Sequence, residues 1–147
     1  MRLAWFAALA LVAQAAAPEP GDWATFLGPD HTSVSRETGL LKSWPEKGPP
    51  LVWKLELGET YAAPAIVKGA MVLFHREAAE EVVERADPET GKKAWRFAYG
   101  TAYVDQFGYN GGPRSMPTID GGKVYTLGAE GRLHCLDLET GKLVWSR

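Results

Sequence analysis

Cysteine, basic residues and long apolar runs are all scarce in this sequence, and each scarcity excludes something. Cys135 is the only cysteine, so no disulfide can form within the chain and its stability has to come from packing. Lys and Arg number 16 against 18 Asp and Glu, which leaves no basic excess for binding nucleic acid. No apolar run approaches the roughly 20 residues that cross a bilayer as a helix. The sequence therefore predicts neither a nucleic-acid partner nor a membrane span.

The first 17 residues have the pattern of a signal peptide. Arg2 supplies a positive start, residues 3–13 are unbroken apolar, and small residues follow in an Ala-x-Ala arrangement. We interpret residues 1–17 as a signal peptide that is cleaved between Ala15 and Ala17. This predicts a periplasmic or extracellular protein.

One stretch of nine residues occurs twice, about 50 positions apart. Residues 87–95 read Asp-Pro-Glu-Thr-Gly-Lys-Lys-Ala-Trp, and residues 137–145 read Asp-Leu-Glu-Thr-Gly-Lys-Leu-Val-Trp. An earlier echo relates residues 64–69 to residues 117–122. A repeat of this length is typical of propeller blades rather than of helical repeats.

Each repeat holds short segments rich in β-branched, aromatic and aliphatic residues, bounded by glycine turns and without helical periodicity. We predict four strands per repeat, at 63–67, 70–75, 80–86 and 92–98 and again at 115–119, 123–127, 132–137 and 142–147. Four short antiparallel strands make one propeller blade. The predicted fold class is therefore all-β, with about two four-stranded blades of an incomplete β-propeller.

The duplicated stretch suits a hairpin turn between the third and fourth strands of a blade. Its aspartate can accept hydrogen bonds from the backbone two residues on, and its glycine can adopt the positive φ of a tight turn. Its tryptophan then lies on the outermost strand, where a large flat side chain can cover the next blade. The structural repeat motif comprises Asp87, Thr90, Gly91, Trp95, Asp137, Thr140, Gly141 and Trp145.

The pattern Asp-x-x-Thr-Gly-Lys-x-x-Trp resembles the tryptophan-docking repeat of the pyrroloquinoline-quinone-like (PQQ-like) β-propeller family. That family includes quinoprotein dehydrogenases and BamB-like outer-membrane assembly lipoproteins. The resemblance covers residues 51–147 and implies the propeller fold. In such propellers the N-terminal strand often completes the last blade of the ring.

Six segments are therefore expected, counting the signal peptide. Residues 1–17 are the signal peptide, and residues 18–50 are an irregular arm over the propeller surface. Residues 51–57 alternate apolar and charged side chains, as an outer strand of another blade would. The remainder is a blade at 58–98, a loop at 99–114 and a blade at 115–147.

The loop at 99–114 is longer than most connections, and long loops on rigid scaffolds often carry function. Its candidate ligand contacts are Tyr103, Asp105, Tyr109, Asn110 and Arg114. The alternative is a packed loop whose aromatic residues cover the channel rim and whose Arg114 pairs with Asp105. We prefer this second interpretation, because fold alone does not assign a ligand.

No other sequence motif indicates a catalytic or binding site. The Asp and Glu residues of each turn give two carboxylates, too few for a calcium cage of six to eight oxygens. His134 and Cys135 are neighbours, so on a strand they point to opposite faces, and we expect a buried cysteine beside a partly exposed histidine. No nucleophile triad or phosphate-binding loop is present. We predict no catalytic, cofactor-binding or metal-binding residue.

Two functions are compatible with the resemblance. The first is a non-catalytic, BamB-like scaffold that binds or assembles proteins and has no cofactor. The second is a fragment of a PQQ-dependent quinoprotein alcohol dehydrogenase, with PQQ and calcium. The resemblance to those dehydrogenases implies two adjacent cysteines beside the cofactor, which Cys135 alone cannot supply, and no calcium-ligand or catalytic-aspartate motif matches. We prefer the scaffold.

Two blades and one spare strand cannot close a ring. Each blade buries its faces against its neighbours, so an open arc exposes apolar faces at both ends. We therefore expect the sequence to be a truncated reading frame or a fragment, whose partners would include the C-terminal blades of the same propeller.

Overall fold

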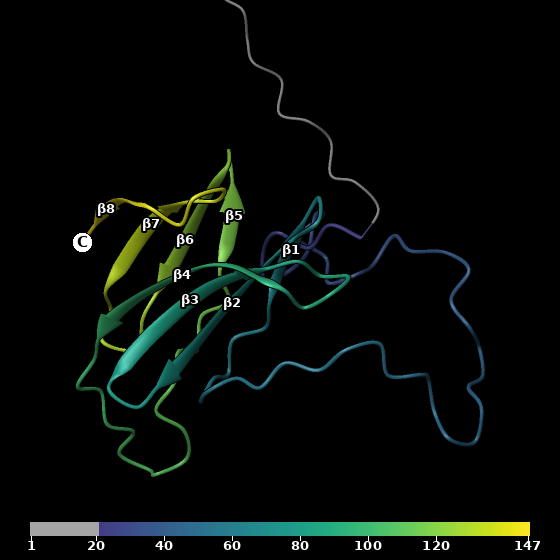
Figure 1. Ribbon diagram of the computed structural model, residues 1–147, viewed down its shortest axis with the longest axis horizontal. Coiled ribbons are helices and arrows are strands. Elements are labelled where there is room, and N and C mark those ends of the chain that lie inside the picture. The colour runs from purple at the N-terminus through teal and green to yellow at the C-terminus, as the bar shows by residue number, and fades with distance from the viewer. Residues whose placement is uncertain (1–20) are drawn as a thin grey trace, which may run out of the picture.

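The computed structural model describes residues 21–147, so the predicted signal peptide at 1–17 lies outside the described residues. The folded part consists of two four-stranded antiparallel sheets (Figure 1). The first sheet has the order β1 (Ala65–Val67), β2 (Ala70–Glu77), β3 (Glu80–Ala86), β4 (Lys93–Gly100). The second has the order β5 (Thr118–Asp120), β6 (Lys123–Leu127), β7 (Leu133–Asp137), β8 (Leu143–Ser146). Each sheet is a simple up-and-down meander, as a propeller blade is, and this confirms the predicted fold class.

The main core lies between the two sheets. Alternation along the strands sends Val72, Phe74 and Val83 to one face of the first sheet, where they form one buried cluster with Val124 and Leu136 of the second. Each such side chain contributes about 1.5–3 kcal/mol on burial. The sheets therefore stack face to face, as adjacent blades do.

The opposite face of the first sheet is covered by the segment that precedes it. Trp53 and Leu55 pack against Met71, Leu73 and Ala86. Residues 51–57, predicted to form an outer strand, have no strand pairing in the described part of the chain. The segment contacts the sheet through side chains rather than through backbone hydrogen bonds, and a strand requires the latter.

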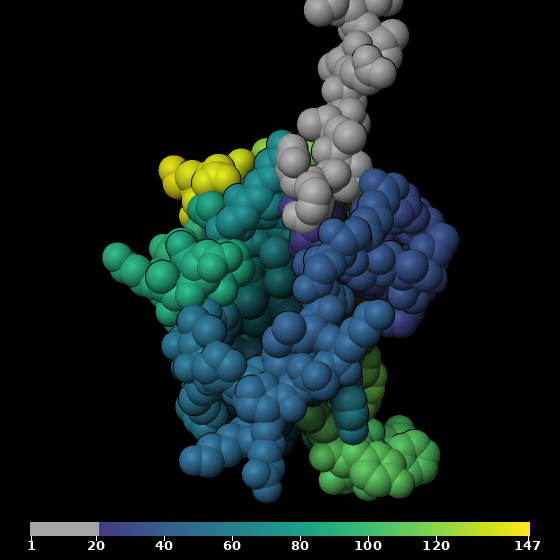
Figure 2. Space-filling model, turned by 90° about the vertical axis from the view of Figure 1, so that its right-hand side faces the viewer, coloured from purple at the N-terminus to yellow at the C-terminus, as the bar shows by residue number. Residues whose placement is uncertain are grey.

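The start of the arm pairs with the first strand of each sheet. The backbone of Trp23 exchanges hydrogen bonds of 2.7 and 3.0 Å with Ile66, beside β1, and Ile119 N of β5 donates to Ala24 O at 2.9 Å. Beyond this anchor, residues 32–50 are irregular and almost entirely exposed. In Figure 2 the arm and the segment after it, in blue, cross the face of the molecule that is turned to the viewer.

No helix occurs in residues 21–147, and so no helix there is long and apolar enough to span a membrane.

Candidate functional site

Both copies of the repeat motif form the expected turn between the third and fourth strands of a blade. In the first, Asp87 Oδ1 accepts from Glu89 N at 2.8 Å and from Thr90 N at 3.0 Å. Gly91 closes the turn with a φ of 70°, a conformation that side chains disfavour. The two backbone hydrogen bonds, Thr90 first, lower the pKa of Asp87, because they favour the charged carboxylate.

The second turn keeps the hydrogen bond from the threonine backbone to the aspartate and adds two side-chain donors. Asp137 Oδ1 accepts from Thr140 N at 3.1 Å and from Thr140 Oγ1 at 2.9 Å, and Asp137 Oδ2 accepts from Lys123 Nζ at 3.0 Å. The lysine hydrogen bond, followed by those of Thr140, lowers the pKa of Asp137 to about 2. Gly141 has a φ of 68°.

Each turn receives a tryptophan from the blade or segment before it. Trp95 Nε1 on β4 donates to Leu138 O at 2.8 Å, and its ring lies against Gly141. Trp145, on β8, is 36% exposed and lies 6.1 Å from the ring of Tyr125, between centroids. Trp95 therefore joins the two blades, whereas Trp145 contacts a ring of its own blade.

The long loop leaves β4 at the end of the blade opposite these turns. Arg76, at the end of β2, fastens it: Nη1 donates to Tyr103 O at 2.7 Å and to Gly111 O at 3.1 Å, while Nε donates to Ala78 O at 2.8 Å. One guanidinium thus ties both limbs of the loop to the β2–β3 turn. Such a multiply bonded arginine holds a loop in one conformation.

A second arginine braces the loop from inside. Arg114 lies over the rings of Tyr61 and Tyr103, with Cζ 5.3 and 5.0 Å from their centroids, and its Nη2 is 3.4 Å from Asp105 Oδ1. Asp105 Oδ2 also accepts from Tyr109 N at 2.7 Å. The expected Arg114–Asp105 pair is therefore present, and both residues act within the loop.

The returning limb of the loop approaches the backbone closely at Gly111 and Gly112. A Cβ at Gly112 would lie 2.0 Å from the backbone oxygen of Glu59, so this position has no room for a side chain. A Cβ at Gly111 would lie 2.6 Å from Arg76 Nη1, which would have to move. Gly111 N donates to Glu59 Oε2 at 2.8 Å, and Asn110 Oδ1 accepts from Gly112 N at 2.8 Å. The loop is fixed along both limbs.

Its tip presents apolar side chains to solvent. Val104, Phe107 and Tyr109 are 77%, 79% and 80% exposed, and the Phe107 and Tyr109 rings stack with centroids 6.2 Å apart. Among the described residues, the rings of Phe107 and Tyr109 are therefore exposed rather than packed. The loop, green in Figure 2, protrudes at the lower edge of the molecule.

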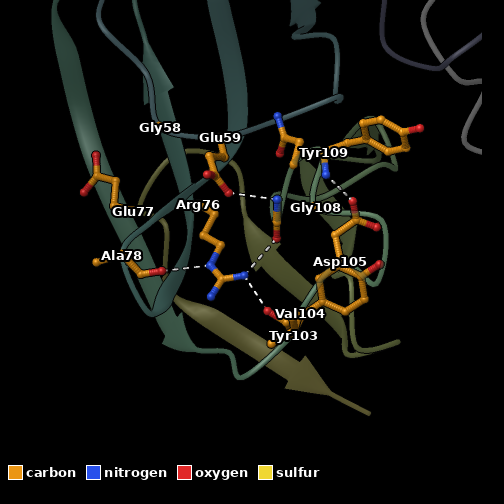
Figure 3. A pocket seen from close by; sticks show the side chains of 12 residues that line it. Gly58, Glu59, Arg76, Glu77, Ala78, Tyr103, Val104, Asp105, Gly108 and Tyr109 are labelled. Carbon is orange, nitrogen blue, oxygen red and sulfur yellow. Dashed lines mark hydrogen bonds between the residues drawn. The ribbon is translucent and has the colours of Figure 1, made fainter.

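A groove of about 580 Å³ runs between the loop and the β2–β3 turn (Figure 3). Its walls include Tyr103, Asp105, Tyr109 and Asn110, four of the five predicted contact residues; the fifth, Arg114, does not line it. The other charged residues of the lining, Glu59, Arg76 and Glu77, were not predicted from the sequence. These three lie on another segment and carry no motif.

A second cavity of about 530 Å³ lies at the other end of the blades, between the start of the arm and the β1–β2 and β5–β6 turns. Apolar side chains of Ala24, Val67 and Ile119 line it, together with Lys68 and Asp120. No buried, unpartnered polar atom of the described residues lines it. It therefore offers space without a defined chemistry.

His134 and Cys135 point to opposite faces of β7, as neighbouring strand residues do. Both are buried, however, and the prediction of a partly exposed histidine is wrong: the His134 ring stacks on Tyr99 with centroids 4.1 Å apart. Within residues 21–147, no three His, Cys, Asp or Glu side chains gather in a way that could hold a metal ion.

Stacked four-stranded antiparallel meanders joined by docked tryptophans define a class of protein, the β-propellers. The match to a family model is more specific. Residues 79–147 match the family described as outer membrane protein assembly factor BamB. This part of the chain is thus formed by PQQ-like β-propeller repeats, which confirms the resemblance of the tryptophan-docking motif.

Solved structures with similar blades come from larger proteins. BamB from Moraxella catarrhalis is 25% identical with a TM-score of 0.46, covering 65% of this chain and 26% of that one. Quinohemoprotein alcohol dehydrogenase from Comamonas testosteroni is 30% identical with a TM-score of 0.44, covering 62% and 13%. A europium-containing methanol dehydrogenase is 21% identical with a TM-score of 0.49, covering 67% and 18%. The chain therefore spans 26% or less of each. No curated protein matches it significantly.

Proposed function

We propose that this chain contributes to an exported, non-catalytic PQQ-like propeller that binds a protein partner through its long loop. The observation that carries the proposal is the loop tip, where Val104, Phe107 and Tyr109 are exposed although the loop is fastened along both limbs. Exposed apolar side chains on a rigid support are typical of protein-binding sites. The family description, an assembly factor, agrees with such a role.

Site-specific photocrosslinking in the source cell tests this function. A photoreactive phenylalanine analogue in place of Phe107 should give one crosslinked protein of defined mass. The same analogue in place of Trp44, an exposed aromatic residue of the arm, is the matched control and should not give that product. Equal products at both positions, or none at position 107, would contradict the proposal.

The dehydrogenase alternative would require calcium and PQQ, and we expect this chain to bind neither. The described residues provide no cluster of three or more metal-ligating side chains, whereas calcium takes six to eight oxygens. We therefore expect the purified chain, supplied with PQQ and calcium, to show neither saturable cofactor binding nor alcohol-dependent dye reduction. Dye reduction that needs both additions would favour the enzyme.

Export is proposed from the charged start and apolar run of residues 1–17. Mass spectrometry of protein from the source cell should find an N-terminus between residues 16 and 18. Intact Met1 on a cytosolic protein would contradict export without affecting the binding function.

A further inference from the structure

The groove beside the loop and the apolar tip form one continuous surface, which is charged in the groove and apolar at the tip. Val104 and Tyr109 belong to both, since they line the groove and are also exposed at the tip. Phe107 stands outside the groove but stacks on Tyr109. An occupant that uses the whole surface has to extend beyond the groove, which favours a segment of a macromolecule over a small molecule.

The charge of the groove is negative. Its lining carries the carboxylates of Glu59, Glu77 and Asp105 against the single guanidinium of Arg76, a balance of 1 − 3 = −2. Arg76 is committed to three backbone carbonyls, and Asp105 is bonded within the loop.

Two of these carboxylates face outward with capacity to spare. Glu59 is exposed and bonds Gly111 N through Oε2 alone, and Glu77 is 45% exposed while it shares Arg96 with Glu80. Figure 3 shows Glu59 and Glu77 on the strand side of the groove; the Glu59 carboxylate points toward the loop, whereas the Glu77 carboxylate points away from it, with Arg76 between Glu77 and the loop. A positive group in the groove would meet the Glu59 carboxylate on the strand side, with Glu77 contributing its charge from the rim, and the aromatic residues of the loop on the other side; carboxylates and aromatic faces both attract cations.

We propose that this surface binds an extended basic segment of the partner protein, with an arginine or lysine in the groove at Glu59 and Glu77 and an apolar side chain on Phe107 and Tyr109. This inference rests on the proposed function and adds the chemistry of the partner. A volume of 580 Å³ lies within the usual range for ligand sites and accommodates a long side chain with its neighbouring backbone. Charge complementarity decides between a basic segment and an acidic one, since like charges weaken binding.

The test uses the full chain and two capped, fluorescently labelled peptides, Gly-Phe-Arg-Phe-Gly and Gly-Phe-Glu-Phe-Gly, followed by anisotropy. The arginine peptide should bind roughly tenfold more tightly than the glutamate peptide, because two partly exposed ion pairs are worth about 1 kcal/mol or less each. The preference should shrink between about 20 mM and about 500 mM salt. Equal affinity of the two peptides, or binding of neither, would overturn the inference.

Charge-neutral variants locate the effect. The double variant E59Q/E77Q keeps an oxygen acceptor for Gly111 N and for Arg96 while it removes both charges, so the arginine peptide should lose most of its advantage. The matched control is E46Q, which neutralises an exposed carboxylate of the arm and should leave the preference intact. An advantage that survives E59Q/E77Q would also overturn the inference.

Two further outcomes separate this inference from the function it extends. A crosslink at position 107 without a preference for the arginine peptide retains the protein-binding function and removes only the basic partner. Chain that sediments with vesicles of mixed phosphatidylcholine and phosphatidylglycerol, and that binds neither peptide, would instead assign the tip to a lipid surface and overturn both.

Discussion

The indole Nε1 of Trp53 donates a hydrogen bond of 3.0 Å to the carbonyl oxygen of Pro88. This is the relationship that Trp95 has with Leu138, at 2.8 Å, one blade further along the chain. In both cases the acceptor follows the turn aspartate, and the ring lies against the turn glycine, Gly91 for Trp53. The segment 51–57 thus occupies, with its side chains, the place from which an outer strand docks on the next blade.

These docking bonds should contribute measurably to stability. Replacing Trp95 by phenylalanine removes the donor and part of the ring, and we expect a loss of about 1–2 kcal/mol in the free energy of unfolding. Urea unfolding followed by circular dichroism would measure it. Trp44→Phe is the control, since Trp44 is exposed and should change stability by less than about 0.5 kcal/mol. Equal effects at the two positions would contradict a docking role.

Two glycines allow the destabilisation caused by steric contact with Trp95 to be separated from that caused by backbone strain at positive φ. Gly141 has a φ of 68°, and a Cβ there would lie 2.6 Å from Trp95 Cδ2. Gly39 has a φ of 74° but nothing within 4 Å of the same position. Alanine should therefore cost about 1–2 kcal/mol at Gly39 from strain alone. At Gly141 it should cost about 1–3 kcal/mol more from overpacking, measured in the same urea titrations. Similar losses in the free energy of unfolding at both sites would mean that Trp95 moves aside without destabilising the protein.

The sequence was sufficient for the blades because their signals are local. β-Branched alternation, Asx turns and glycines at positive φ act over a few residues, and all eight strands were placed to within three residues at either end. Docking by Trp95 followed from its position after the turn. Docking by Trp53 did not, because no Asp-x-x-Thr-Gly pattern precedes it.

The candidate site was less predictable because its contacts join distant segments. The length and composition of the loop pointed to Tyr103 and Asp105, but Arg76 reaches the loop across 27 and 35 residues and Glu59 across 52. Neither residue belongs to a recognisable sequence motif. Strand alternation alone does not indicate which group a side chain at the end of a strand will form a hydrogen bond with. Likewise, the burial of His134 depends on Tyr99 from the neighbouring blade.

A buried carboxylate links the two blades and offers a further test. Glu81 of β3 accepts from Tyr99 Oη at 2.5 Å and from Ala129 N, in the β6–β7 turn, at 2.8 Å. Burial, followed by the hydrogen bond to Glu81, strongly raises the pKa of Tyr99. Tyr99→Phe leaves the carboxylate with one donor fewer, and should cost about 1.5–3 kcal/mol in the free energy of unfolding.

The control for Tyr99→Phe is Tyr109→Phe, because the Tyr109 hydroxyl is exposed and should contribute almost nothing. The double variant Tyr99→Phe with Glu81→Gln should recover part of the lost free energy of unfolding. A buried amide that lacks a hydrogen-bond donor destabilises the fold less than a buried carboxylate that lacks one. If Tyr99→Phe were neutral while the fold persisted, the short bond would carry no net stability.

The last prediction concerns the dependence of stability on pH. His134, on β7, is buried against Tyr99, and Arg132 lies just before the start of the same strand. Burial first, and then the charge of Arg132, lower the pKa of His134, and the more distant Glu81 opposes them. A lowered pKa means that protonation favours the unfolded chain. The contribution of His134 is therefore complete above its unfolded pKa, about 6.5, and is lost as the pH falls through and below that value.

Unfolding measured from about pH 7.5 to about pH 5.5 should show this loss in the native sequence. The slope should be smaller in His134→Phe, which keeps a ring against Tyr99 and cannot titrate. Asp137→Asn is the control: the folded pKa of Asp137 is about 2 and its ordinary value is 3.8, so its contribution is present above 3.8 and is lost only toward pH 2. That variant should therefore alter the acid limb and leave the slope above pH 5.5 unchanged. Identical slopes in the native chain and in His134→Phe would show that His134 takes up its proton without disturbing the contact between the blades.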